Sequence, residues 1–289
     1  MKPEDVNMVG VIGCGIMGSG IVEVCARADI AVTYVEANDE LVTGGRARIE
    51  RSVGKAVDRG KLPAEDSESV LARITGTTDF DALSEADLVI EAVVENLDAK
   101  LEVFTTLDRV TRDDVILASN TSSIPIAKLG SATSRPDKVI GMHFFNPPPV
   151  MKLIELVRAL TTSDETVEFA RSFAERLDKV TVLSKDRAGF IVNLLLIPYL
   201  NGAVRMLEEG FASAEDIDAA VKLGLSHPMG PLELLDLVGL DTTLFIAEIL
   251  YEEFKIPEYA PPPLLKRMVE AGRLGRKSGR GFFDYPREG

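Results

Sequence analysis

Short apolar runs alternate with amphipathic stretches through the first part of the chain. The runs have the composition of buried parallel strands and occupy residues 8–12, 31–35, 74–77, 88–93, 115–118, 139–143, 151–157 and 180–183. Helical spacing fills residues 16–28, 39–59, 99–110 and 164–177 between them, and Gly44-Gly45 would loosen the second of these helices. This alternation predicts an α/β fold with an N-terminal Rossmann-type doubly wound sheet.

The pattern changes after Lys185, and almost all of the remaining chain has helical spacing. Helices are predicted over residues 189–208, 214–223, 232–238, 242–253 and 264–271. We therefore expect two domains, with the sheet in residues 1–185 and an all-α C-terminal domain in residues 186–289. A helical domain of this kind could cover a substrate and form a dimer surface.

The composition is that of an acidic globular protein. Hydrophobic residues make up 46% of the 289 residues, and a formal net charge of -14 argues against nucleic acid or an anionic membrane as partner. Cys14 and Cys25 lie too far apart on or beside one predicted helix to form a disulfide, which favours a reducing compartment. No signal-peptide pattern begins the chain, and its longest apolar run, residues 190–200, is broken by Asn193 and Pro198. We expect a cytoplasmic protein.

A glycine-rich segment, Gly13-Cys14-Gly15-Ile16-Met17-Gly18, follows the first predicted strand and opens the first predicted helix. Its first glycine permits a tight turn, Gly15 lets a pyrophosphate approach the backbone, and Gly18 lets the helix pack on the strand. The amides at the start of the helix, including those of Ile16 and Met17, are then available to phosphate. Such a motif is weak by itself, but its position between a strand and a helix indicates a dinucleotide site.

The second predicted strand ends at Glu36, where an acid can accept hydrogen bonds from the 2′-hydroxyl of an adenosine ribose. No arginine or lysine follows in residues 37–40, so nothing there is suited to a 2′-phosphate. We therefore expect NAD rather than NADP as the cofactor. The domain with the sheet is accordingly the expected NAD-binding domain.

A polar loop, Ser119-Asn120-Thr121-Ser122-Ser123, follows a later predicted strand. Ligands in open α/β sheets bind beyond the carboxyl ends of the strands, so this loop should face the nicotinamide end of the cofactor. Clusters of Ser, Thr and Asn are also common in ordinary turns, and this alternative stays open. No Cys/His cluster with metal-ligand spacing occurs in the sequence, so no metal is expected.

His143 is one of only two histidines and stands in Gly141-Met142-His143-Phe144-Phe145-Asn146-Pro147, at the end of a predicted strand. A histidine beside two phenylalanines is more often a packed residue, but imidazole titrates near neutral pH and suits proton transfer from an alcohol. Glu155 lies in the following strand between Ile154 and Leu156, where a carboxylate needs a partner. His143 is the nearest suitable partner in the chain. The carboxylate would orient the imidazole and stabilise its protonated form.

Together these motifs resemble those of the 3-hydroxyacyl-CoA dehydrogenase family, most closely its short bacterial members. The resemblance runs almost end to end and rests on residues 9–20, 91–96, 119–123, 141–147, 189–193, 226–231 and 275–283. It implies NAD-dependent oxidation of a (3S)-3-hydroxyacyl-CoA to a 3-ketoacyl-CoA and the reverse reduction, with 3-hydroxybutyryl-CoA as the expected short-chain substrate. It also implies a homodimer built mainly from the second domain.

The resemblance carries the family's functional roles onto individual positions of this sequence. It implies that the acid/base, its orienting carboxylate and two substrate contacts near the reacting carbon are His143, Glu155, Ser122 and Asn193. Beyond the glycine loop, the positions expected to contact NAD are Glu36, Glu95, Lys100, Asn120, Asn146 and Lys277. Those expected to contact the CoA substrate are Ser52, Arg59 and Ser122.

Three departures from the family pattern and two rival functions stay open. Glu36 stands where many relatives have Asp, Arg59 replaces a Lys, and Pro148 replaces a small aliphatic residue, which leaves the acyl-chain preference undetermined. One rival is an NAD-dependent dehydrogenase of a free hydroxy or sugar acid, as in the lambda-crystallin-like relatives. The other is a non-catalytic NAD-binding structural protein, although such a protein would need none of the four residues His143, Glu155, Ser122 and Asn193.

Overall fold

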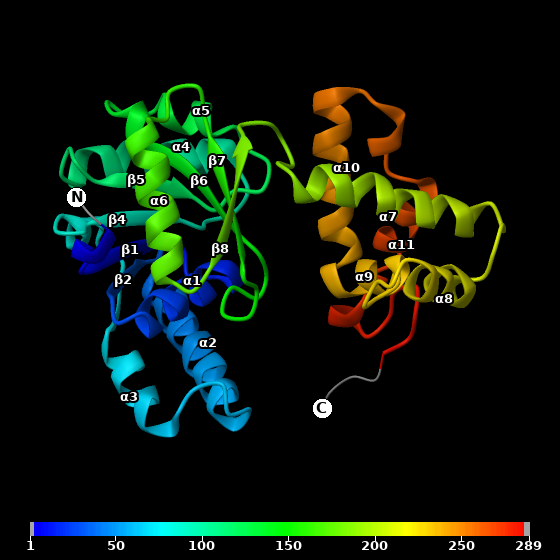
Figure 1. Ribbon diagram of the computed structural model, residues 1–289, viewed down its shortest axis with the longest axis horizontal. Coiled ribbons are helices and arrows are strands. Elements are labelled where there is room, and N and C mark those ends of the chain that lie inside the picture. The colour runs from blue at the N-terminus through cyan, green and yellow to red at the C-terminus, as the bar shows by residue number, and fades with distance from the viewer. Residues whose placement is uncertain (1–2, 286–289) are drawn as a thin grey trace. The chain divides into compact units, whose positions relative to one another are not determined.

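The first part of the chain forms one eight-stranded sheet with the strand order β3-β2-β1-β4-β5-β6-β7-β8 (Figure 1). This computed structural model describes residues 3–285, and the chain divides into two compact units after Arg187. The strands are β1 (Met8–Ile12), β2 (Ala31–Val35), β3 (Ile74–Thr77), β4 (Leu88–Glu91), β5 (Ile116–Ser119), β6 (Val139–Phe144), β7 (Leu153–Arg158) and β8 (Val180–Lys185). The strands β1, β2 and β3 follow one another toward one edge of the sheet, and the chain then returns to place β4 on the other side of β1, as in a Rossmann sheet. The predicted fold class is confirmed.

The helices of the first unit connect successive strands. They are α1 (Ile16–Arg27), α2 (Asp39–Asp58), α3 (Ala64–Ala72), α4 (Leu97–Val110), α5 (Ile126–Gly130) and α6 (Asp164–Arg176). The ends of α1, α2, α4 and α6 differ from the predicted ranges by at most two residues. The pattern did not predict α3 and α5, because helices this short repeat a periodic pattern too few times. Within residues 3–285, no helix is both long enough and apolar enough to cross a bilayer.

One pair of neighbouring strands departs from the parallel arrangement. β6 and β7 run antiparallel, whereas the other neighbouring pairs in the sheet are parallel. The segment between them needs no crossover helix, because antiparallel strands can be joined directly. Their register places His143 opposite Glu155. Side chains directly opposite each other in such a pair lie on the same face of the sheet, so the two residues become neighbours.

The core of the first unit lies around the central strands. β4, β5 and β6 are buried at every position, as expected for strands covered on both faces. The helix α2 packs closely on the turn after β1, where a β-carbon on Gly45 would lie 2.8 Å from Cβ and Sγ of Cys14. Gly45 therefore permits this close approach, and α2 is continuous through both glycines.

The second unit is helical, as predicted. Its helices are α7 (Val192–Glu208), α8 (Ala214–Gly224), α9 (Pro231–Val238), α10 (Leu240–Phe254) and α11 (Pro263–Glu270). Their core includes the fully buried side chains of Leu200, Leu232, Leu240 and Leu265. Short 3-10 helices in the two units occupy Pro3–Asp5, Phe80–Leu83, Pro136–Lys138, Pro257–Tyr259 and Arg276–Ser278.

Candidate active site

The glycine loop between β1 and α1 leaves the backbone open at one position only. Gly13 has φ of +86°, and a β-carbon there would lie 2.8 Å from the carbonyl oxygen of Ala92. A β-carbon on Gly18 would lie 1.8 Å from the carbonyl oxygen of Gly13. A β-carbon on Gly15, in contrast, would meet nothing within 4 Å. Two glycines are therefore required by the packing of the chain, and the third borders open space.

The helix α1 begins at this loop. Among the described residues, no side chain caps its N-terminus. Ile16 is 72% exposed and Met17 is half-buried. The first amides of a helix without a capping side chain remain available to a phosphate, and the helix dipole favours an anion there. The open backbone at Gly15 and these amides fit the pyrophosphate of a dinucleotide.

Two oppositely charged side chains bond to Cys14 within the glycine loop. Glu36 directly follows β2, and its Oε1 accepts a hydrogen bond from the amide of Cys14 at 2.5 Å. Arg48 of α2 donates from Nη1 to the carbonyl oxygen of Cys14 at 3.2 Å. Burial, assisted by Glu36, raises the pKa of the Cys14 thiol to about 12, so the thiol stays neutral. The fold thus brings to the loop a cation that residues 37–40 do not supply.

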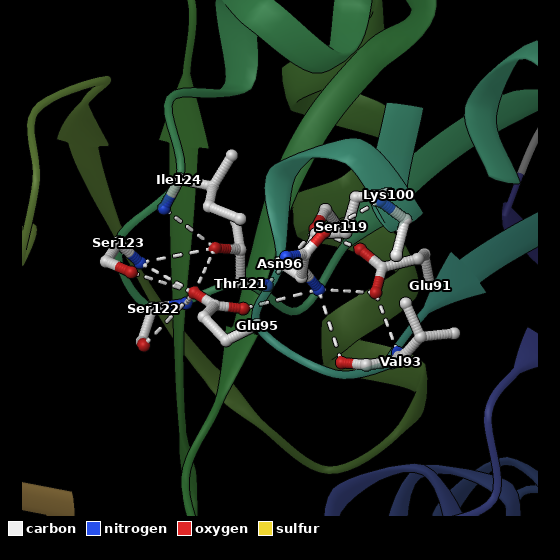
Figure 2. A network of polar contacts seen from close by, with 11 residues as sticks. Glu91, Val93, Glu95, Asn96, Lys100, Ser119, Thr121, Ser122, Ser123 and Ile124 are labelled. Atoms are coloured by element: carbon white, nitrogen blue, oxygen red, sulfur yellow. Dashed lines mark hydrogen bonds and ion pairs between the residues drawn. The ribbon is translucent and has the colours of Figure 1, made fainter. Parts of the chain in front are cut away.

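A buried ion pair lies at the carboxyl end of β4 (Figure 2). The side chains of Lys100 in α4 and Glu91, the last residue of β4, are 1% and 0% exposed, and Nζ lies 2.5 Å from Oε1. The same oxygen accepts a hydrogen bond from the amide of Val93 at 2.7 Å. The second oxygen of Glu91 accepts one from the hydroxyl of Ser119 at 2.6 Å. Glu91 therefore ties the ends of β4 and β5 to α4.

Glu95 is a second carboxylate beside Lys100, with Oε2 3.3 Å from Nζ (Figure 2). Its Oε1 accepts hydrogen bonds from the hydroxyl of Thr121 at 2.5 Å and from the amides of Ser122 and Ser123 at 3.0 and 3.2 Å. Burial opposes ionisation, but Lys100 and these hydrogen bonds hold the pKa of Glu95 below its usual range. The ionised Glu95 therefore fixes the conformation of the loop after β5.

The family resemblance assigns Glu95 and Lys100 to the cofactor, and the sequence analysis gives Glu91 no role. In the structure the ammonium of Lys100 faces three protein oxygens, one each from Glu91, Glu95 and the carbonyl of Val93. Glu91 holds this arrangement together. A carboxylate inside an apolar run is the signal that could have identified it, because a buried carboxylate requires partners.

Asn120 connects the loop after β5 to β6. Its Oδ1 accepts a hydrogen bond from the amide of Phe144 at 2.9 Å, and its own amide donates to the carbonyl oxygen of Glu91 at 2.8 Å. Phe144 follows His143 in β6, so Asn120 fixes the end of the strand that carries the imidazole. Asn146 lies beyond this strand and is exposed.

His143 and Glu155 form a buried pair across β6 and β7. Nδ1 of the imidazole lies 2.8 Å from Oε2 of the carboxylate, and the two side chains are 9% and 0% exposed. An ionised carboxylate can only accept a hydrogen bond, so the neutral imidazole must carry its proton on Nδ1, the nitrogen that faces Glu155. The other nitrogen, Nε2, is then unprotonated and can act as the base. The ring of Phe145 packs with its centroid 4.6 Å from that of the imidazole. This arrangement suits general acid–base catalysis.

The two positions expected to contact the nucleotide end of CoA have different surroundings. Ser52 of α2 is half-buried beside Glu23 of α1, where burial raises the pKa of the Glu23 carboxyl in spite of Ser52 and Arg27. Arg59 is exposed and directly follows the last residue of α2. Pro148, whose effect the sequence leaves open, packs on α1, where a β-carbon on Gly20 would lie 2.6 Å from its Cδ.

Asn193 and Lys277 belong to the second unit. Asn193 lies in the first turn of α7 and is 7% exposed. Lys277 is about half exposed, and its Nζ lies 2.5 Å from Oδ1 of Asp241 in α10. The candidate residues of the first unit, in contrast, gather after neighbouring strands of one sheet. Those after β4, β5 and in β6 are Glu95, Lys100, Asn120, Ser122 and His143.

Dehydrogenases that use a nicotinamide cofactor bind its pyrophosphate at such a glycine loop and place an acid/base near the strand ends, so the chain falls in this class. The family descriptions "3-hydroxyacyl-CoA dehydrogenase, NAD binding domain" and "3-hydroxyacyl-CoA dehydrogenase, C-terminal domain" match residues 8–187 and 189–285. The chain therefore belongs to the 3-hydroxyacyl-CoA dehydrogenase family, which confirms the resemblance seen in the sequence.

Named relatives extend over almost the full chain. The 3-hydroxybutyryl-CoA dehydrogenase of Mycobacterium tuberculosis is 55% identical over 284 residues, which cover 98% of this chain and 99% of the relative. A probable 3-hydroxybutyryl-CoA dehydrogenase of Deinococcus radiodurans is 47% identical over 276 residues, which cover 96% of this chain and 99% of the relative. The crystal structure of (S)-3-hydroxybutyryl-CoA dehydrogenase from Ralstonia eutropha matches with a TM-score of 0.92 at 46% identity, covering 98% of this chain and 100% of that one.

Proposed function

We propose that this protein catalyses the NAD-dependent oxidation of (3S)-3-hydroxyacyl-CoA to 3-ketoacyl-CoA and the reverse reduction, with 3-hydroxybutyryl-CoA as its preferred substrate. The observation that carries the proposal is the buried 2.8 Å contact between Nδ1 of His143 and Oε2 of Glu155 in a chain of this family. A protein that only bound NAD would have no need of an acid/base pair. The substrate is supported by the names of the relatives.

His143 acts as the acid/base. In the oxidation, its Nε2 takes the proton of the 3-hydroxyl group, and Glu155 stabilises the imidazolium through Nδ1. Bound NAD supplies the hydride acceptor, C4 of the nicotinamide. In the reduction, His143 returns the proton to the oxygen on C3. Because the two side chains are at most 9% exposed, bulk water competes little for this proton.

Ser122 and Asn193 are proposed to donate hydrogen bonds to the oxygen on C3. Donors that are held in place before the reaction lower such barriers most. The hydrogen bond of 3.0 Å from the amide of Ser122 to Glu95 supports this role, since it holds the loop in one conformation. The roles of Asn193, Asn146 and Lys277 rest on the family resemblance.

We propose that residues 1–185 bind NAD and that residues 186–289 contribute to substrate binding and dimerisation. The glycine loop accommodates the pyrophosphate, and Glu36 accepts a hydrogen bond from the 2′-hydroxyl of the adenosine ribose. A 2′-phosphate would meet the negative charge of Glu36, so NADH should be preferred to NADPH. An NADPH value of kcat/KM equal to or above the NADH value would contradict this assignment.

We also propose that the protein is a cytoplasmic homodimer. Large apolar side chains are exposed in the second unit, among them Leu195, Phe211, Leu223 and Leu225 at 71%, 76%, 85% and 62%. Burial of such side chains against a second copy would remove apolar surface from water. Light scattering at micromolar concentration should give the mass of a dimer, and a monomer mass would count against the proposal.

Initial rates of reduction by NADH test the substrate assignment. Acetoacetyl-CoA should give the highest kcat/KM among 3-ketoacyl-CoA thioesters of increasing chain length, and free 3-keto acids should give little turnover. Faster turnover of free acids would favour the rival dehydrogenase of hydroxy or sugar acids. Intact NADH binding without turnover of either class would favour the structural NAD-binding protein.

A further inference from the structure

We infer that Arg48 is a latent 2′-phosphate-binding residue of the cofactor site, and that the site is therefore one substitution, at Glu36, away from accepting a 2′-phosphate. The inference rests on the proposed binding of NAD at the glycine loop. Glu36 and Arg48 hold the same residue of that loop. The carboxylate of Glu36 accepts a hydrogen bond from the backbone amide of Cys14 at 2.5 Å. The guanidinium of Arg48 donates one to the carbonyl oxygen of Cys14 at 3.2 Å.

The packing of α2 explains how Arg48 reaches this position. A β-carbon on Gly45 would lie 2.8 Å from Sγ of Cys14 and 3.3 Å from Cε2 of Tyr34, so only glycine permits this approach of the helix. Arg48 follows Gly45 by three residues, which places it on the same side of α2, about one turn further along. The close approach of α2 therefore delivers the guanidinium to the glycine loop.

The acid and the arginine have opposite effects on a dinucleotide. An acidic side chain after the second strand accepts a hydrogen bond from the ribose 2′-hydroxyl of NAD, whereas a nearby arginine accommodates the 2′-phosphate of NADP. Here both are present, and both side chains belong to half-buried residues that border the same loop. In the wild-type protein the charge of Glu36 opposes a phosphate. Selectivity against NADP thus depends on Glu36, and Arg48 would bind the phosphate once that charge is removed.

Calorimetric titration of NADPH and NADH into four proteins tests the inference. These are the wild type, Glu36→Ser, Glu36→Ser/Arg48→Gln and Glu36→Ser/Arg51→Gln. A charge-assisted hydrogen bond changes affinity by about 10- to 150-fold, so Glu36→Ser should bind NADPH at least about tenfold more tightly than the wild type. Adding Arg48→Gln should remove most of this gain. Arg51 is exposed on the same helix, and Arg51→Gln changes the net charge equally but should leave the gain intact.

Equal NADPH affinity in the Arg48 and Arg51 double variants would overturn the inference, as would a gain below about threefold in Glu36→Ser. Glu36→Gln keeps an acceptor for the Cys14 amide and repeats the test if the serine variant does not fold. Titration needs no turnover. Binding of NADH without activity on acyl-CoA would refute the proposed reaction and leave the inference intact, whereas absence of NADH binding would refute the cofactor site and the inference together.

Discussion

The ion pair between Glu91 and Lys100 makes the stability of the first unit sensitive to a single charge. Glu91→Gln keeps the shape of the side chain but removes its charge, which leaves Lys100 with Glu95 at 3.3 Å. Lys100 is 1% exposed, so water cannot replace the missing carboxylate. Removing one partner of a buried pair costs about 3–5 kcal/mol, and the remaining carboxylate favours the lower end. We expect the free energy of unfolding to fall by about 3 kcal/mol.

Asp87→Asn is a matched control at the opposite end of β4. Asp87 accepts hydrogen bonds from the amides of Asn7 and Met8 and lies 3.0 Å from Arg112, whose side chain is 37% exposed. Arg112 keeps this ion pair in contact with solvent although the Asp87 side chain is 13% exposed, and such a pair contributes about 0–1 kcal/mol. Thermal unfolding followed by circular dichroism should show a fall in Tm of about 6–12 °C for Glu91→Gln and a much smaller fall for the control.

The double variant Glu91→Gln/Lys100→Met separates the loss of charge balance from the loss of packing. It removes both charges of the pair, so no ammonium is left buried beside an amide. It should therefore unfold at a higher temperature than Glu91→Gln. Equal losses in Glu91→Gln and Asp87→Asn would refute the reasoning, and so would a double variant less stable than Glu91→Gln.

Two further substitutions test contacts seen in the structure, and a third tests a role that the family resemblance implies. Because the pKa of Glu95 is lowered on folding, its ionised form stabilises the fold above the unfolded value of 4.5, and this stability is lost as the pH falls through the folded value. The urea midpoint should therefore decline more steeply below about pH 5 in the wild type than in Glu95→Gln, and parallel curves would contradict the expectation. Glu155→Gln should lower kcat by about 10- to 100-fold without changing NADH affinity, measured by steady-state kinetics and calorimetry. Arg59→Glu should raise KM for acetoacetyl-CoA by about 10- to 150-fold, but an equal loss with acetoacetyl-pantetheine would show that Arg59 does not act on the nucleotide.

Local patterns were sufficient to predict the segment that consists of β1, the glycine loop and α1. A buried strand, three glycines and a helix follow one another directly, so each boundary has a signal in adjacent residues. The contact between His143 and Glu155 also had a signal, because a carboxylate in an apolar strand needs a partner. The antiparallel direction of β7 had none. Strand direction depends on how the chain turns between the strands, and both directions give similar apolar runs.

Contacts between helices and loops that are distant in the sequence could not be predicted from it. Arg48 reaches the glycine loop only because Gly45 lets α2 pack on Cys14, and the spacing of α2 alone does not indicate which element it contacts. Glu91 was visible as an acid in an apolar run. Its three donors, however, come from Val93, α4 and the end of β5, which the sheet brings together.

The central claim is that His143 transfers the proton in reduction of a 3-ketoacyl-CoA by NADH. The most direct measurement is kcat for acetoacetyl-CoA reduction in the wild type and His143→Ala, with NADH affinity measured in parallel. A positioned acid/base contributes about 10²- to 10⁴-fold, so the variant should lose at least about 100-fold in kcat and bind NADH as the wild type does. A variant that keeps its kcat within about threefold of the wild type would contradict the claim.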